Sequence, residues 1–292
     1  MIKVDNLSVC YGKGMPDVIS NMSFELEKGC ILNILGQNAV GKTTLIRTLM
    51  RELQNYRGSI RVGGNEIRSY SIRDYAKIMG VVSTNFNTFQ NLLVADYLVT
   101  GFINQMTPFS KPNSDYVQRA YEVLSSFGKQ DLFNKQIDQL SSGERQIVMI
   151  ARVLLQNPEI IIVDEPTANL DIKNQIMVLN QIQRLSQQGY TVLVTTHNPG
   201  HAYSLGGKTL IMGKGKYHFG DTIKHRVISC WIFVTIALIF VWTKLFHSSL
   251  LNSPTPKRNG GTPITEATVF LSSSTVSLIA KSESVSGLTC ST

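Results

Sequence analysis

The clearest chemical signal in this sequence is a glycine-rich loop that ends in a lysine and a threonine. Residues 36–43 fit the pattern G-x-x-x-x-G-K-[ST], in which glycines let the backbone wrap around phosphate and the loop amides point inward as donors. Lys42 would reach the β- and γ-phosphates of a nucleotide, and the Thr43 hydroxyl would bind Mg²⁺. A glycine-rich turn before a helix is the alternative interpretation. The predicted nucleotide-binding residues of this region are Gly36, Gln37, Asn38, Ala39, Val40, Gly41, Lys42, Thr43 and Thr44.

A second candidate is the pair of carboxylates Asp164 and Glu165, which end the β-branched run 159–165. Such a run predicts a strand buried on both faces of a parallel sheet, whose carboxyl end borders the ligand crevice. Alternation along the strand would point the two side chains to different sides. Asp164 would bind Mg²⁺ directly or through water, and Glu165 could polarise the water that attacks the γ-phosphate. Two solvated acids at a strand end are the alternative.

The elements that must position these residues follow from the apolar pattern. Residues 30–35 predict a buried strand before the loop, and residues 44–50 predict a helix whose N-terminus adds a positive dipole end. Residues 2–35 read as short antiparallel strands, and 57–64 as a strand with a tight turn. From about 85 to 150 the pattern is helical, including a helix over 113–127. Residues 158–220 return to alternating strand and helix, as a parallel sheet requires.

Residues 140–146 read Leu-Ser-Ser-Gly-Glu-Arg-Gln, and here the chain resembles the ATP-binding cassette (ABC) ATPases, whose consensus is L-S-G-G-[EQ]-[RQ]-Q. Ser142 replaces the first glycine of that consensus. From the residues alone this is a helix start, with Ser141 or Ser142 as the N-cap. The resemblance implies that Ser141, Gly143 and Gln146 form a site for the γ-phosphate of ATP bound on a partner subunit. It therefore implies a homodimer, or a pair of ATPase subunits, with two ATPs between them.

Three further positions match the family in order. Tyr11 lies where the family has an aromatic residue stacked on adenine, although a core or surface tyrosine is the alternative. Asp171 ends a segment, 168–171, that matches the loop crossing the dimer interface, and it could also be the N-cap of a helix over 172–185. His197 follows the apolar run 192–196 and matches the histidine that holds the γ-phosphate and orients the attacking water. The resemblance covers residues 1 to about 220 and implies catalytic roles for Lys42, Glu165 and His197.

One position departs from the family. Thr84 falls where the family has a glutamine that touches Mg²⁺ and water. Threonine can still offer an oxygen to a hydrated Mg²⁺, so Thr84 is the third candidate metal ligand, although its side chain is shorter by two bonds. An ordinary residue at a strand end is the alternative. Gln90 is nearby but out of register. Residues 81–84 and 91–102 resemble ATPases of importers for iron complexes, haem and cobalamin, which often read V-V-x-T and then N-L-T-V-x-x-L-V-x-x-G-R. Phe102 replaces the last arginine, and a generic amphipathic helix is the alternative.

The composition fits a large globular domain. The chain has 292 residues, of which 43% are hydrophobic, and a formal net charge of +8. It contains no Lys/Arg block and no interleaving of aromatic and basic residues, so no nucleic-acid partner is expected. The cysteines show neither metal spacing nor a disulfide framework, which fits a reducing cytosol. The N-terminus opens directly into a strand pattern, so no signal peptide is expected.

Beyond residue 220 the sequence changes character. Residues 227–242 are apolar except for Ser229 and Thr235. Extended through Lys244 to Phe246, the run has 20 residues and would be about 30 Å long as a helix, so one interpretation is a single membrane anchor. Within the 221–292 tail, residues 248–292 are rich in Ser and Thr, which is typical of disorder. The other interpretation is that a shifted reading frame or a gene fusion produced this tail.

Together these features predict an α/β fold: a P-loop NTPase with a parallel-sheet core, an N-terminal antiparallel β layer and an inserted α-helical subdomain at about 85–150. The resemblance implies an ATPase with ATP and Mg²⁺ as cofactors, bound peripherally to integral-membrane permease subunits on the cytoplasmic face of the inner membrane. It would power import, with an iron siderophore, haem or cobalamin as the candidate substrate. A soluble ABC ATPase without a transport role and a catalytically impaired nucleotide-binding regulator are the alternatives.

Overall fold

The computed structural model of the protein describes residues 1–12, 14–82, 91–106 and 112–222. The chain divides into two compact units, Met1–Thr235 and Ile236–Thr292, and every described residue belongs to the first. Thr84, Gln90 and the apolar segment 227–246 therefore lie outside the described residues. Within the described ranges, no helix is long and apolar enough to cross a membrane.

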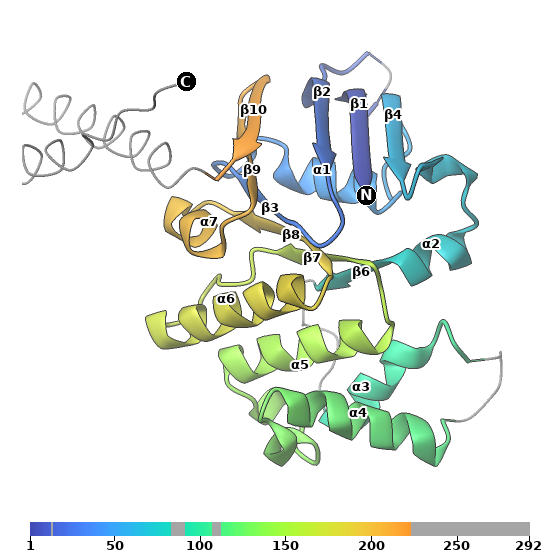
Figure 1. Ribbon diagram of the computed structural model, residues 1–292, viewed down its shortest axis with the longest axis vertical. Coiled ribbons are helices and arrows are strands. Elements are labelled where there is room, and N and C mark those ends of the chain that lie inside the picture. Colours follow the sequence, from blue (N-terminus) through green and yellow to red (C-terminus); the bar gives the residue numbers. More distant parts are fainter. Residues whose placement is uncertain (13, 83–90, 107–111, 223–292) are drawn as a thin grey trace, which may run out of the picture. The chain divides into compact units, whose positions relative to one another are not determined.

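The first sheet is antiparallel and forms from the N-terminal third of the chain (Figure 1). β1 (Ile2–Val9) pairs with β2 (Ile19–Leu26) on one side and with β4 (Tyr56–Val62) on the other. β5 (Asn65–Glu66) pairs with β4 at the edge of the sheet. The strand order is β2-β1-β4-β5. Apolar residues of β1 such as Ile2, Val4 and Val9 are buried, as expected for a sheet with one face on a core. The predicted antiparallel β layer is confirmed for β1 and β2, but the prediction over 2–35 is wrong for residues 31–35, which pair parallel in the second sheet.

The second sheet carries the strands that end at the candidate site. It has the order β10-β9-β3-β8-β7-β6. The strands from β9 to β6 run parallel to their neighbours, and β10 pairs antiparallel with β9 at the edge. Their bounds are β3 Ile31–Leu35, β6 Met79–Val82, β7 Ile160–Asp164, β8 Thr191–Thr196, β9 Lys208–Gly213 and β10 Lys216–Asp221. Parallel strands buried on both faces read as continuous apolar runs, and the sequence of β7 shows such a run.

The helices begin and end close to the predicted boundaries. α1 (Lys42–Leu49) follows the glycine-rich loop, and α4 (Ser114–Ser126) has Asn113 as its N-cap, with the side chain accepting from the Tyr116 amide. The remaining helices are α2 Ile72–Ile78, α3 Val94–Val99, α5 Ser142–Leu155, α6 Ile172–Gln187 and α7 Pro199–Leu205. Short 3₁₀ turns lie at Ile67–Ser69, Thr100–Phe102, Gln130–Leu132 and Ile137–Gln139.

The side chains of β7 alternate between two hydrophobic cores. Ile160 and Ile162 join the core shared by both sheets and α1, whereas Ile161 and Val163 join the core that β7 and β8 share with α5 and α6. A third core holds the helical segment together and is formed by α3, α4 and one side of α5. α5 contributes Val148 to this third core and Met149 to the second. This helix therefore joins the helical segment to the parallel sheet.

Candidate functional site

The glycine-rich loop leaves β3 at Leu35 and enters α1 at Lys42. A Cβ on Gly36 would lie 2.6 Å from the Met212 carbonyl oxygen, so any larger residue would push β3 away from β9. Gly41 has a φ of +107°, a left-handed conformation that favours glycine. Gly36 and Gly41 are therefore two positions of the loop where a side chain would clash or strain the backbone, as expected for a backbone that approaches a phosphate closely.

Lys42 folds back over the loop instead of extending into solvent. Its side chain is only 7% exposed. The Nζ atom donates to the carbonyl oxygens of Gly36 at 2.6 Å and Gln37 at 3.3 Å, and it lies 3.2 Å from Oε1 of Glu165. A buried ammonium needs such partners to offset the loss of water. The positive charge therefore sits between the loop and the end of β7.

The two acidic residues at the end of β7 bond to one hydroxyl from the neighbouring strand, Asp164 through its carboxylate and Glu165 through its backbone amide. Thr195 on β8 donates its Oγ1 hydrogen to Oδ1 of Asp164 and accepts the backbone N–H of Glu165 at 2.8 Å. β7 ends at Asp164, and Glu165 adopts a φ of +47°. The strand alternation predicted from the sequence is therefore wrong at Glu165, because the left-handed turn brings both side chains to the same cleft.

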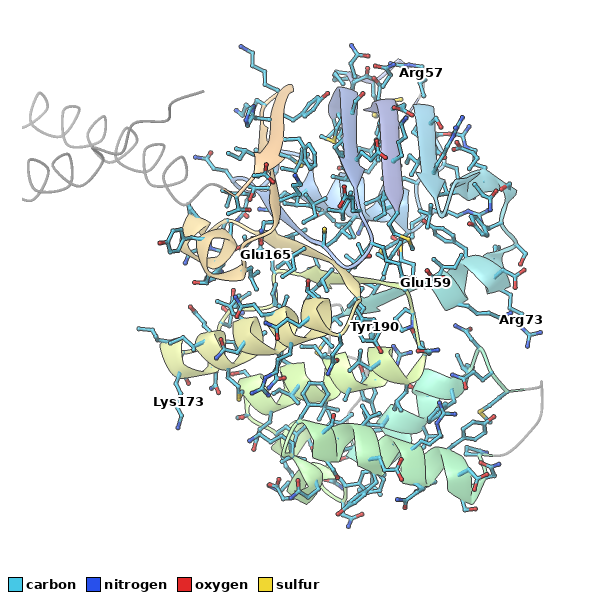
Figure 2. All side chains as sticks on the ribbon, in the orientation of Figure 1. Arg57, Arg73, Glu159, Glu165, Lys173 and Tyr190 are labelled. Atoms are coloured by element: carbon cyan, nitrogen blue, oxygen red, sulfur yellow. The ribbon has the colours of Figure 1, made fainter. Side chains whose placement is uncertain are left out.

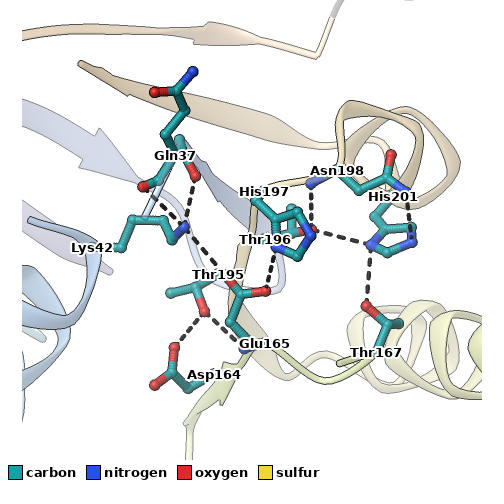
Figure 3. A network of polar contacts seen from close by, with 11 residues as sticks. Gln37, Lys42, Asp164, Glu165, Thr167, Thr195, Thr196, His197, Asn198 and His201 are labelled. Carbon is teal, nitrogen blue, oxygen red and sulfur yellow. Dashed lines mark hydrogen bonds and ion pairs between the residues drawn. The ribbon is translucent and has the colours of Figure 1, made fainter. Parts of the chain in front are cut away.

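Glu165 is shared between a lysine and a histidine. Its Oε1 pairs with Lys42, and its Oε2 lies 2.9 Å from Nδ1 of His197, the first residue after β8 (Figure 3). The His197 side chain is mostly exposed, whereas the glutamate is partly buried. Glu159 directly precedes β7 and Glu165 directly follows it, so these two acids lie at opposite ends of the strand (Figure 2). Of the two, Glu165 lines the cleft described next, and Glu159 does not.

These residues line a single cleft of about 640 Å³ at the carboxyl ends of β3 and β7. Tyr11 stands at its wall, about half exposed, and its phenol forms a 2.9 Å hydrogen bond with Oγ1 of Thr44. Tyr11 is therefore neither a core residue nor remote from the loop. The cleft is lined by Tyr11, Val18, Asn38, Ala39, Gly41, Lys42, Thr43, Thr44, Asp164, Glu165, Ala168 and His197.

The chemistry of the donor set fits Mg²⁺ bound together with phosphates. Thr43 and Asp164 line the same cleft, and a hydroxyl plus one carboxylate is a normal protein share of such a site. Within the described ranges, no group of three or more His, Cys, Asp or Glu side chains forms a closed metal cage. Thr84, the third predicted ligand, lies outside those ranges.

The predicted γ-phosphate segment does not join this cleft. Ser141 is the N-cap of α5: its Oγ accepts from the Glu144 amide at 3.3 Å, and the Glu144 carboxylate accepts from the Ser141 amide at 3.0 Å. These bonds hold the pKa of the Glu144 carboxyl below its usual range. A Cβ on Gly143 would meet Asn174 of α6 at 2.6 Å. The helix start proposed from the residues alone is present, with Ser141 as the cap.

Two more predicted residues also lie away from the cleft lining. Gln146 is buried on α5, and its Nε2 has no hydrogen-bond partner among the residues that the structure describes. Asp171 is the N-cap of α6, where its carboxylate accepts from the amide and from Nδ2 of Asn174, both at 2.8 Å. Because Asn174 also touches Gly143, the starts of α5 and α6 lie side by side.

Sequence reasoning missed several polar residues behind the site. Thr195, Thr196, Thr167 and His201 are all buried, and each bonds to a segment that carries a predicted catalytic residue. Burial lowers the pKa of His201, the neighbouring His197 lowers it further, and Glu165 acts in the opposite direction. The signal in the sequence was the pair of threonines at the end of an otherwise apolar strand.

Replacing Ser141 with alanine is expected to lower the free energy of unfolding by about 1 kcal/mol, because the bonds of the Ser141 hydroxyl with the amide and the carboxylate of Glu144 are lost. Ser141→Asn is the matched control, since asparagine caps as well as serine. Urea unfolding measures both, and equal stability of Ser141→Ala and wild type would contradict the capping role. Because bonds from Ser141 depress the pKa of the Glu144 carboxyl on folding, the part of the stabilisation that this carboxylate carries is present above its unfolded pKa and is lost as pH falls through its folded pKa.

Comparison with known proteins gives a consistent result. The family model described as ABC transporter matches residues 19–168. The phosphonates import ATP-binding protein PhnC 1 of Ruegeria sp. (strain TM1040) is 30% identical and covers 76% of this chain and 89% of its own. The molybdate import ATP-binding protein MolC of Haemophilus influenzae is 33% identical and covers 76% and 82%. A solved metal-chelate type ABC transporter in an inward-facing conformation is 32% identical, covers 76% and 82%, and has a TM-score of 0.67.

Proposed function

Because the chain belongs to the ABC transporter family and is an ATPase, we propose that it is the ATP-hydrolysing subunit of an importer and acts on a membrane permease. Both curated relatives above are import proteins by name. Figure 3 shows the observation that supports this best: Lys42, Glu165 and His197 meet at one point. Peripheral association with the cytoplasmic face of the membrane follows from such a partnership.

In the proposed mechanism, the loop amides and Lys42 bind the β- and γ-phosphates, and Tyr11 stacks on the adenine. Thr43 and Asp164 would hold Mg²⁺, which would supply positive charge to offset that of the phosphates. Glu165 accepts a proton from the attacking water, and His197 holds the γ-phosphate and orients that water. The contact of 2.9 Å between His197 and Glu165 supports a joint action of these two side chains.

A second subunit completes the proposed site. Ser141, Gly143 and Asp171 belong to the family pattern, yet none of them lines the cleft formed by the loop and β7. The starts of α5 and α6 are adjacent, so these residues form a second set on the same chain. We therefore place the second set of one subunit against the nucleotide of the other, with ATP closing the pair and hydrolysis reopening it.

For the substrate we propose a metal chelate of the iron-siderophore, haem or cobalamin type. The solved relative at 32% identity is of the metal-chelate type, and residues 91–102 have the corresponding sequence pattern. The curated relatives are named for phosphonates and molybdate, so small oxyanions are the substrate class that an experiment must separate from metal chelates.

Purification from detergent-solubilised membranes tests this function. We expect a multi-spanning permease to co-purify, and the complex in lipid vesicles to accumulate a radiolabelled ferric siderophore only with ATP and Mg²⁺. Phosphonate and molybdate uptake are measured in parallel, and a complex carrying Lys42→Ala is the inactive control. Uptake of an oxyanion instead would overturn the substrate class, and the absence of any membrane partner would overturn the importer itself.

A further inference from the structure

A buried histidine behind the cleft contacts both segments that carry Glu165 and His197. His201 lies on α7 and is 9% exposed. Its Nδ1 lies 3.2 Å from the Thr167 hydroxyl and 3.1 Å from the Thr196 hydroxyl. Its Nε2 lies 3.2 Å from Nδ2 of Asn198 (Figure 3). No step of the proposed mechanism uses this imidazole.

The surrounding bonds fix which ring nitrogen carries the proton. The Gly200 amide donates to Oδ1 of Asn198 at 2.9 Å, so the NH₂ end of that side chain faces His201. Nε2 of His201 must therefore accept from Asn198. The neutral ring then carries its proton on Nδ1, which donates to the threonine hydroxyls. Burial lowers the pKa of His201, so the neutral ring is the form present near pH 7.

The two threonines belong to different segments of the active site. Thr167 is buried and lies two residues after Glu165, at the start of the turn that leads to Asp171. Thr196 is the last residue of β8 and directly precedes His197. The Thr196 hydroxyl also accepts the Asn198 amide at 3.1 Å.

The His201 imidazole therefore bonds both to the segment that carries Glu165, through Thr167, and to the segment that carries His197, through Thr196. The contact between Glu165 and His197 joins two side chains from different strand ends, and its geometry depends on how the segments behind it are held. Buried polar networks with satisfied partners give such rigidity, whereas the loss of one donor leaves several groups unpaired.

We propose that His201 is a positioning residue for ATP hydrolysis, which holds the segment after Glu165 and the His197 segment in one register through its Nδ1 proton. This inference rests on the roles proposed above for Glu165 and His197. His201 touches neither nucleotide nor attacking water, and it acts through the two residues that do.

Two conservative substitutions separate the two ring nitrogens. Asparagine places its amide at the same number of bonds from Cα as Nδ1 and keeps the donor to the threonines. Glutamine places its amide at the distance of Nε2 and loses that donor. We expect His201→Gln to lower kcat by about 10- to 100-fold with the KM for ATP within about twofold, and His201→Asn to retain most of the wild-type kcat.

Thr167→Val and a matched control complete the test. Thr167→Val removes one acceptor while keeping the shape, and it should lower kcat in the same way as His201→Gln. Because both remove the same bond, the double variant should be no slower than the slower single variant. His218→Gln makes the same exchange on the exposed surface of β10 and should not change kcat. Fully additive losses in the double variant would overturn the shared role.

The readouts separate positioning from folding. Each kcat is divided by the fraction of the protein that binds a fluorescent ATP analogue. Thermal unfolding is measured for every variant. If His201→Gln turns over ATP at the wild-type rate per binding-competent site, the inference is overturned. If Glu165→Gln also stays active, the proposed roles themselves fail. If Glu165→Gln is inactive while His201→Gln is unimpaired, only the role of His201 fails.

Discussion

Replacing Glu165 with glutamine lowers the rate of ATP hydrolysis by about 10²- to 10⁴-fold and leaves ATP bound, because the amide keeps the shape of the side chain but cannot accept a proton. The carboxylate pairs with Lys42 on one oxygen and with His197 on the other. With turnover blocked, two subunits should remain closed around ATP. Phosphate release measures the first effect, and light scattering with ATP and Mg²⁺ measures the second.

Glu159→Gln is the matched control for this variant. Glu159 precedes β7 as Glu165 follows it, and its side chain is 51% exposed and pairs only at the surface, with Lys28 at 3.3 Å. Surface pairs of this kind contribute at most about 1 kcal/mol, so its turnover should match wild type. A Glu165→Gln protein that hydrolyses ATP at the wild-type rate would contradict the general-base role. A protein that stays monomeric with saturating ATP would contradict the paired site.

Replacing Lys42 with alanine is expected to weaken ATP binding by about 10- to 100-fold and to abolish turnover. Charge-assisted hydrogen bonds contribute about 1.5–3 kcal/mol each, and Lys42 is the cation that we propose to bind the phosphates. Its Nζ already lies at the mouth of the loop, 2.6 Å from the Gly36 carbonyl oxygen. Titration with a fluorescent ATP analogue measures the affinity.

Lys28→Ala controls for the loss of a lysine, because Lys28 is exposed and precedes β3 in the sequence, whereas the glycine-rich loop follows β3. Its affinity for ATP should equal that of wild type. Unchanged affinity in Lys42→Ala would mean that the buried ammonium serves only to pair with Glu165. Thermal unfolding without nucleotide shows how much of the effect belongs to that pair.

The local features of the site could be predicted from the sequence because their causes are local. The loop between β3 and α1 is defined by its glycines, and the apolar run before Asp164 indicates a buried strand. Ser141 and Asp171 could be predicted as N-caps because serine and aspartate are favoured caps and each directly precedes a segment with apolar residues at helical spacing. Each of these features depends on residues within a few positions of one another.

The contacts between strands could not be predicted in this way. The pairing of Lys42 with Glu165 and the bonds of Thr195 require β8 to lie between β3 and β7, and that order depends on distant segments. Because β3, β7 and β8 are all apolar, their sequences alone do not reveal their neighbours. His201 was missed for the same reason, since its partner Thr167 is 34 residues away.

The position of α5 in two hydrophobic cores has a mechanical consequence. This helix of 14 residues is about 21 Å long, and it packs against the sheet with one side and against α3 and α4 with the other. Ser141 caps its N-terminus and Gly143 lies in its first turn. Because one continuous helix contacts both cores, a displacement of α3 and α4 is expected to move Ser141 and Gly143 as well.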